Sequence, residues 1–191
     1  MSTAAIAVRV RARNVEARDI VTLELVPVAG ALPPFTAGSH IDVHLPNGLV
    51  RQYSLANDPA ERDRYLIAVQ RDRASRGGST CVHDALHEGA TVGISAPRNH
   101  FPLVEDAPHV VLVGGGIGVT PLLAMAARLQ SLGRSWELVY CARTREHAAA
   151  RASLAAYGER VRFNFDEEPG GRMLDLAALV AQAPAGTHFY C

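Results

Sequence analysis

The chain has 191 residues, which is enough for one large or two small domains, each able to bury a hydrophobic core. Its 19 basic and 19 acidic residues balance, so charge gives no case for nucleic acid or an anionic membrane as partner. All basic residues other than histidine are arginine, which excludes chemistry that needs a Schiff-base or P-loop lysine.

The three cysteines, Cys81, Cys141 and Cys191, are too few and too widely spaced for a disulfide framework or a cysteine metal site. The first seven residues lack the positive segment and apolar core of a signal peptide. No later run approaches the roughly 20 apolar residues that span a bilayer. We therefore expect a cytoplasmic protein without a membrane segment.

The first half of the sequence predicts short antiparallel strands. Apolar and polar residues alternate in segments 6–13, 19–26, 41–45, 50–55, 65–71 and 91–96. A turn is expected near Asn14, another at Pro46-Asn47-Gly48, and a helix over residues 79–86. This pattern is typical of an antiparallel Greek-key β-barrel with one helix across it.

The second half changes to alternating strands and helices. Strands are predicted at residues 109–113, 136–141, 161–165 and 187–190, and helices at 121–132, 146–157 and 174–181. Thr120 fits the N-cap and Pro121 the first helical position. This order predicts a parallel sheet that binds ligands at its carboxyl edge. The aperiodic segment 98–108 separates the two patterns, so we predict domains at 1–105 and 106–191.

The sequence Arg51-Gln52-Tyr53-Ser54-Leu55 places three kinds of chemistry on one strand. Arg51 and Tyr53 are two positions apart and project from the same face. The guanidinium suits a phosphate, and the tyrosine ring offers an apolar face to a heterocycle. The Ser54 hydroxyl can donate to a ring nitrogen in one redox state and accept from it in the other. Together these groups indicate a flavin site.

The sequence Arg76-Gly77-Gly78-Ser79 stands just before the predicted helix of the first half. Its glycines allow close approach of the backbone to an anion, and Ser79 can cap the helix, whose free amides favour phosphate. Read alone, the segment fits a flexible turn with a capping serine equally well.

A third glycine-rich run is Gly114-Gly115-Gly116-Ile117-Gly118-Val119-Thr120-Pro121. The usual dinucleotide fingerprint requires a glycine where Val119 stands, so this is not that motif. Without the other motifs, a tight strand-to-helix turn would explain the run.

In this order and spacing the three motifs resemble the flavin and nicotinamide motifs of ferredoxin-reductase-like enzymes. The resemblance is greatest to the phthalate dioxygenase reductase branch, which includes the vanillate demethylase reductases. It implies an NADH-dependent flavin reductase that passes hydride from nicotinamide to flavin, and electrons singly to an iron–sulfur centre. The implied partner is an oxygenase or demethylase component that acts on an aromatic substrate.

The resemblance also implies site residues. Flavin binding falls to Arg51, Gln52, Tyr53, Ser54, Ala68, Val69, Gln70, Arg76, Gly77, Gly78 and Ser79. Nicotinamide-nucleotide binding falls to Gly114, Gly115, Gly116, Gly118, Thr120, Pro121 and Arg143. Catalytic roles fall to Ser54, Thr120 and Cys191. The Gly-Gly-Ser form favours FMN over FAD, and we favour NADH, although Arg143 and Arg145 leave NADPH open.

The last residues, Thr187 to Cys191, resemble the strand that delivers a Cys-Gly-Pro motif beside the nicotinamide. We therefore expect the sequence to be partial. In the resembled branch a domain with a four-cysteine [2Fe-2S] cluster follows, so a cluster is expected only in that further domain.

Two alternative functions stay open, whereas a metal site and a hydrolase are not expected. The chain could be an FAD-type module similar to ferredoxin-NADP reductase or flavohaemoprotein reductase, or a flavin-binding electron-transfer subunit that does not react with NADH. The pairs His40/His44 and His83/His87 lack a third ligand, so no metal site is expected. Ser79 with His83 lacks a nucleophile elbow, which argues against a hydrolase.

Overall fold

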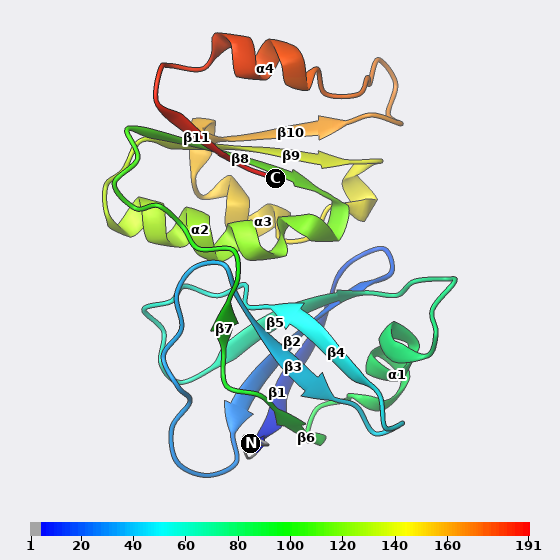
Figure 1. Ribbon diagram of the computed structural model, residues 1–191. Helices are drawn as coiled ribbons and strands as arrows, with labels where there is room; N and C mark the ends of the chain where they lie inside the picture. Colours follow the sequence, from blue (N-terminus) through cyan, green and yellow to red (C-terminus); the bar gives the residue numbers. More distant parts are fainter. Residues whose placement is uncertain (1–4) are drawn as a thin grey trace.

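The computed structural model describes residues 5–191, which form two sheets with helices packed between and above them (Figure 1). The antiparallel sheet contains β1 (Ile6–Ala17), β2 (Ile20–Pro27), β3 (Ser39–His44), β4 (Val50–Ser54), β5 (Tyr65–Gln70), β6 (Thr91–Ile94) and β7 (Arg98–Asn99). The parallel sheet contains β8 (His109–Gly115), β9 (Trp136–Ala142), β10 (Val161–Phe165) and β11 (Thr187–Tyr190). The fold is the two-domain architecture expected for ferredoxin-reductase-like proteins. The boundary at residue 105 stays a prediction.

The antiparallel sheet curls into a barrel that does not close. Its strand order is β4-β3-β6-β1-β2-β5, with β7 paired to β3. The end strands β4 and β5 lie beside each other, but no pairing joins them in the described part of the chain. The prediction of a barrel is confirmed with that correction, and the open β4–β5 seam leaves backbone and side chains accessible.

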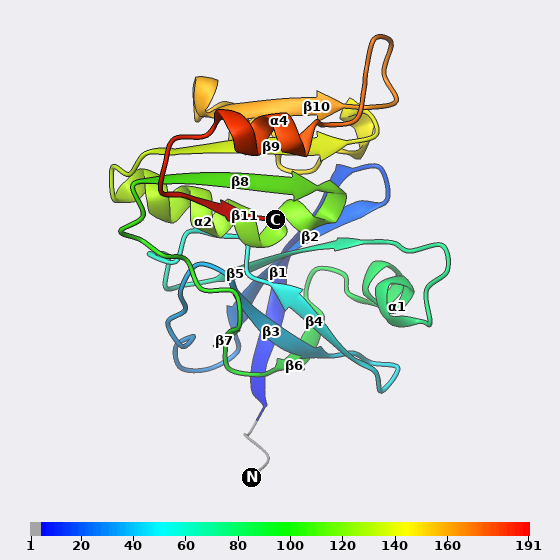
Figure 2. The same ribbon diagram turned by 45° about the horizontal axis from the view of Figure 1, so that its top comes forward.

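In the second domain, the strand order is β10-β9-β8-β11. The helices α2 (Thr120–Ser131) and α3 (Arg151–Ala155) lie between this sheet and the barrel, and α4 (Leu176–Gln182) covers the other face (Figures 1 and 2). Short 3-10 turns η1 (Gly116–Val119), η2 (Arg145–His147) and η3 (Gly158–Arg160) connect the elements. Residues at the carboxyl ends of β8 and β9 share one cavity with residues 70–73 of the barrel.

The helix α2 is fixed by apolar burial. Leu122, Met125 and Leu129 are buried in the same cluster as Leu112 and Leu138 of the sheet. Each fully buried side chain of this size contributes about 1.5–3 kcal/mol. This packing positions the glycine turn, which precedes α2, at the carboxyl edge of the parallel sheet.

Two local predictions were wrong. The turn expected near Asn14 lies at Arg18 and Asp19, because register shifts in β1 let that strand continue to Ala17. The helix expected over residues 146–157 is broken, since Ala150 has a left-handed φ of 56° and only Arg151–Ala155 is α-helical. The short strand β7 lies within the aperiodic segment 98–108, and the domain boundary placed in that segment stays a prediction.

None of the helices in residues 5–191 is long and apolar enough to cross a membrane.

Candidate functional site

A cavity of about 510 Å³, the Arg51 cavity, opens at the seam between β4 and β5. It is lined by Arg51, Gln52, Tyr53, Ser54, Ala68, Val69, Gln70, Asp72, Ser75, Arg76, Ser79, Ile117, Gly118, Thr120 and Pro121. Twelve of these residues are among those predicted from sequence. Because the seam is unpaired, the edges of both strands are free to contact a ligand there.

One end of the Arg51 cavity has the chemistry of an anion site. The helix α1 (Gly78–Ala85) begins behind Arg51, and Gly77 takes the N-cap position with φ 92°. A side chain at Gly78 would meet Nε of Arg51 at 2.4 Å, so only glycine lets the guanidinium lie over the helix start. Arg76 lines the same cavity, so two arginines and the start of a helix lie near one another here.

The prediction that Ser79 caps α1 was wrong. The cap position belongs to Gly77, and no side chain bonds there. The Ser79 hydroxyl instead accepts a 3.1 Å hydrogen bond from the backbone N–H of Asp72. Ser75 Oγ accepts one from Gly77 N at 3.1 Å. Because both hydroxyls already accept these bonds, neither caps α1, and the bonds hold the segment 72–79 against the start of the helix.

Tyr53 and Ser54 form the wall of the cavity along β4. Tyr53 is half-buried and packs against the main core, and burial raises the pKa of its phenol, so the ring stays neutral at physiological pH. Within residues 5–191 the Ser54 hydroxyl has no hydrogen-bond partner. That hydroxyl is therefore available to a bound ring nitrogen.

The glycine turn follows β8 and divides its residues between two cavities. Gly114 is packed tightly, since a Cβ there would lie 3.1 Å from Cα of Val119. Nothing lies within 4 Å of a Cβ placed on Gly115, Gly116 or Gly118, so these backbones border open space. The turn therefore offers exposed backbone to a ligand, as the sequence predicted.

Thr120 does not cap α2, contrary to the prediction. Val119 holds the N-cap position, with no side-chain bond. The Thr120 hydroxyl donates to the carbonyl of Ile117 at 2.6 Å, and the residue is 4% exposed. That bond fixes the 3-10 turn η1 against the start of α2, at the floor of the Arg51 cavity.

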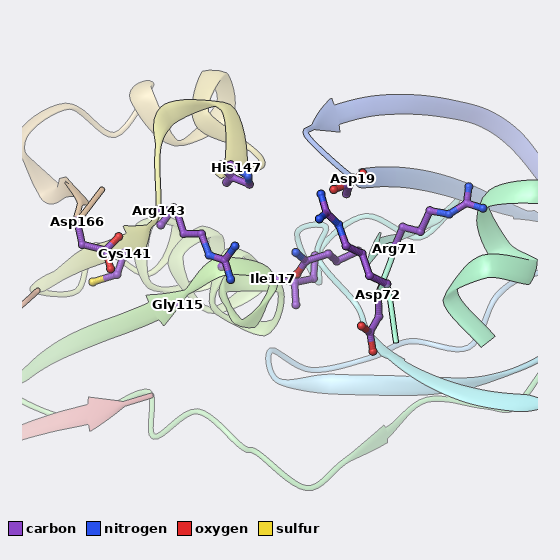
Figure 3. A pocket seen from close by; sticks show the side chains of 13 residues that line it. Asp19, Arg71, Asp72, Gly115, Ile117, Cys141, Arg143, His147 and Asp166 are labelled. Atoms are coloured by element: carbon purple, nitrogen blue, oxygen red, sulfur yellow. The ribbon is translucent and has the colours of Figure 1, made fainter. Parts of the chain in front are cut away.

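A second cavity of about 830 Å³, the Arg143 cavity, lies between the barrel and the carboxyl edge of the parallel sheet (Figure 3). Its lining residues are Asp19, Gln70, Arg71, Asp72, Arg73, Gly115, Gly116, Ile117, Cys141, Ala142, Arg143, His147 and Asp166. Figure 3 shows Arg143 reaching across it from the end of β9, with Cys141 and Asp166 behind. Arg71 points away toward α1, where it pairs with both carboxylate oxygens of Asp84 at 2.9 and 3.1 Å.

The two cavities share Gln70, Asp72 and Ile117, so they form one continuous cleft. Burial, with a contribution from Asp166, raises the pKa of the Cys141 thiol, which is therefore a neutral wall and not a nucleophile at neutral pH.

Not every predicted site residue lies on the cleft. Gly77, Gly78 and Gly114 line neither cavity, and their backbone lies behind the cavity walls. Cys191 is exposed and lines neither cavity, and its catalytic role stays a prediction.

The sequence did not predict Asp72, Ser75 and Ile117 in the Arg51 cavity. In the Arg143 cavity it also did not predict Asp19, Arg71, Arg73, Cys141, Ala142, His147 and Asp166. Asp166 follows a parallel strand at its carboxyl end, and that position was a usable signal.

The structure shows the surroundings of one histidine from each of the two pairs. His83 is buried, and its Nε2 lies 3.0 Å from the carbonyl of Val69. His40 Nε2 is buried without a partner in the described residues, and burial lowers the pKa of that imidazole. Across residues 5–191 no three His, Cys, Asp or Glu side chains come together as metal ligands.

In sequence and in fold the chain is similar to reductase components of oxygenase and demethylase systems. The vanillate O-demethylase oxidoreductase of Pseudomonas putida is 52% identical over 180 residues, covering 93% of this chain and 56% of that protein. A solved structure of phthalate dioxygenase reductase superimposes with a TM-score of 0.93 at 39% identity, covering 98% of this chain and 60% of that one. The chain is a homologue of phthalate dioxygenase reductase.

A third similar protein is phenoxybenzoate dioxygenase subunit beta from Ectopseudomonas oleovorans, which is 49% identical over 189 residues, covering 98% of this chain and 59% of that protein. The chain thus spans 56% to 60% of the length of these three relatives. No family model matches the chain.

Proposed function

We propose that this chain is the flavin- and nicotinamide-binding part of an oxygenase or demethylase reductase, with FMN in the Arg51 cavity and NADH entering from the Arg143 cavity. One observation carries the proposal: the two cavities form one cleft through Gln70, Asp72 and Ile117. A cofactor at the barrel seam and a nucleotide at the sheet edge are thereby adjacent.

The residues of the Arg51 cavity fit FMN. Arg51, Arg76 and the α1 amides match a phosphate, and the absent side chain at Gly78 keeps Arg51 over the helix start. The Tyr53 ring supplies an apolar face, and Ser54 supplies an unengaged hydroxyl. The anion groups gather at one end of the cavity, as a mononucleotide with a terminal phosphate requires.

The nucleotide side fits a dinucleotide at the carboxyl edge of a parallel sheet. Gly115 and Gly116 present open backbone, and Arg143 reaches into the cavity from the end of β9. Thr120 lines the Arg51 cavity and donates to the carbonyl of Ile117, a residue that lines both cavities, which supports its assignment to the nicotinamide end.

When bound, a flavin supplies exchange of two electrons with a nicotinamide and of one electron with a metal centre. This chain positions both ligands next to each other. The solved relative is described as modular for electron transfer from pyridine nucleotides to [2Fe-2S]. We extend that role to this protein, with an iron–sulfur centre as acceptor, an oxygenase or demethylase component as partner, and the cytoplasm as location.

The test is an anaerobic titration of the flavin-loaded chain with NADH, followed by oxidised-flavin absorbance. Loss of absorbance supports the reductase. Persistence of oxidised flavin supports a binding subunit instead. Mass measurement of flavin extracted from the purified protein separates FMN from FAD. A protein that takes up neither flavin would contradict the assignment of the Arg51 cavity.

A further inference from the structure

One turn of the barrel borders both cavities of the cleft. It follows β5 and runs from Arg71 to Arg76, just before α1. Arg73 lines the Arg143 cavity, Ser75 and Arg76 line the Arg51 cavity, and Asp72 lines both. The turn therefore carries arginine to the proposed nucleotide side of the cleft as well as to the proposed flavin side.

Hydrogen bonds fix the backbone of this turn. The N–H of Asp72 donates to the Ser79 hydroxyl at 3.1 Å. Asp72 in turn accepts two bonds, from the N–H of Ala74 to Oδ1 at 2.9 Å and from the N–H of Ser75 to the carbonyl at 3.1 Å. Arg73 stands between these bonded positions. Its backbone is thus held in place, so a contact made by its side chain costs less ordering of the chain than a contact from a free loop.

The arginines at the two ends of Asp72 differ in their partners. Arg71 is held by Asp84, whose carboxylate oxygens lie 2.9 and 3.1 Å from the guanidinium. Arg73 is exposed, and across residues 5–191 its guanidinium makes no ion pair and no hydrogen bond. Arg73 can therefore bind a ligand in the Arg143 cavity without losing another contact.

The opposite wall of the cavity is the open part of the glycine turn. Gly115 and Gly116 line the same cavity as Arg73, and a Cβ placed on either glycine would have open space around it. Figure 3 shows Asp72 on the barrel side of the cavity, and Gly115 with Arg143 on the sheet side. A ligand that lies on the glycine turn thus faces the turn that carries Arg73.

The charges around the cavity make an unpaired arginine favourable for an anionic ligand. Three carboxylates line the cavity, those of Asp19, Asp72 and Asp166. Arg71 is neutralised by its pair, and Arg143 has a loose contact, 3.7 Å, with the exposed Glu167. Both phosphates of a dinucleotide are negatively charged. Without Arg73, a diphosphate here would meet these carboxylates with Arg143 as the one arginine to offset them.

From this arrangement we propose that Arg73 binds the diphosphate of the nicotinamide nucleotide, as a contact that the barrel contributes across the cleft from the glycine turn. The inference rests on the proposed function, because it takes the Arg143 cavity as the nucleotide site. The planar guanidinium can donate two parallel hydrogen bonds to phosphate oxygens. The nucleotide is then held by both domains, which fixes its nicotinamide end relative to the flavin.

The test measures binding of ADP-ribose to the flavin-loaded protein by calorimetry. ADP-ribose keeps the diphosphate and lacks the nicotinamide, so binding is measured without turnover. Arg73→Gln should weaken binding about five- to tenfold, a smaller loss than for a buried charged contact because Arg73 is exposed. Arg73→Lys keeps the charge but not the fork and should lose less, whereas Arg73→Glu should lose more.

Two further measurements separate a phosphate contact from a structural effect. The affinity for ADP-ribose should fall less steeply with added salt in Arg73→Gln than in wild type, because one screened charge contact is gone. The affinity for FMN should stay within about twofold of wild type, since Arg73 does not line the Arg51 cavity. Arg62→Gln is the matched control, a change at an exposed barrel arginine that lines neither cavity, and it should alter the binding of neither ligand.

An ADP-ribose affinity of Arg73→Gln within about twofold of wild type, an unchanged salt dependence, or an equal loss in Arg62→Gln would overturn the inference. A parallel loss of FMN affinity would also overturn it, because the effect would then lie in the turn itself. Failure of wild type to bind ADP-ribose would overturn the proposed nucleotide site, and the inference with it. Melting temperatures close to that of wild type establish that the variants are folded.

Discussion

Gly78 lies directly against Arg51: a Cβ at position 78 would be 2.4 Å from Nε, 3.0 Å from Cγ and 3.1 Å from Cδ of that arginine. Two motifs that are more than 20 residues apart in sequence thus meet through the absence of one side chain. The contact links the first strand motif to the helix start at the anion end of the Arg51 cavity.

Gly78→Ala should displace Arg51 and weaken FMN binding by about 1–3 kcal/mol, the range for overpacking. Gly78 does not have a positive φ, and the arginine side chain can move, so the melting temperature without flavin should stay near that of wild type. Fluorescence titration with FMN measures the affinity. The double variant Gly78→Ala/Arg51→Ala should bind no more weakly than Arg51→Ala alone, because the two changes act through one side chain. Additive losses would contradict this coupling.

Arg51→Ala should weaken FMN binding by about 1.5–3 kcal/mol, the range for hydrogen bonds to charged groups. Riboflavin, which lacks the phosphate, should bind poorly to both proteins. Arg62→Ala is the matched control, since Arg62 is exposed and lines neither cavity of the cleft. An FMN affinity within threefold of wild type would remove Arg51 from the phosphate site.

Glu24 joins three segments of the barrel. Its carboxylate pairs with Arg11 of β1 and, at 2.6 Å, with Arg64 just before β5, and its side chain is 13% exposed. The hydrogen bond from Arg11 is the main reason that the pKa of Glu24 is lowered below its usual value. A carboxyl group whose pKa is lower in the folded state stabilises the fold above the unfolded-state pKa, about 4.3. That stabilisation is lost as the pH falls through the folded-state pKa.

Glu24→Gln should therefore lower the melting temperature at pH 7 by roughly 3–10 °C. The difference from wild type should shrink as the pH falls below about 4.3. Melting curves of both proteins from pH 7 to pH 3 measure it, with Glu159→Gln as an exposed control. Parallel curves over this range would show that Glu24 contributes no charge-dependent stability.

The sequence was sufficient for the general architecture because its signals are local. The alternation around Arg51 and Tyr53 needs only the period of a strand, and both side chains line one cavity as predicted. The limits of β10 and β11 agree with the prediction for the same reason.

The helix predicted over residues 146–157 failed because contacts from elsewhere override its propensity. Glu146 O accepts from Arg18 N, Ala149 N donates to the Tyr140 hydroxyl, and Ala150 N donates to Glu16. These bonds come from the β1–β2 hairpin and from β9, and they hold Ala150 in a left-handed conformation. No pattern within the segment encodes them.

The same limit applies to the site. Whether a hydroxyl caps a helix depends on which backbone N–H groups compete for it. Here the Asp72 N–H donates to the Ser79 hydroxyl, which therefore does not cap α1. The pairing of Glu168 with Arg145 depends on two loops that are adjacent only through the β9–β10 register.

Ser54 carries the last prediction, because its hydroxyl lines the Arg51 cavity and has no partner within the described residues 5–191. A hydroxyl that donates in one redox state and accepts in the other changes its contact during the reaction. Ser54→Ala should therefore slow flavin reduction at saturating NADH more than it weakens FMN binding, since an interaction that strengthens along the reaction contributes mainly to the rate. Anaerobic stopped-flow gives the rate and titration gives the affinity, with Ser131→Ala, an exposed serine at the end of α2, as control. A loss of affinity with no loss of rate would mean that Ser54 supports binding alone and does not contact the reacting nitrogen.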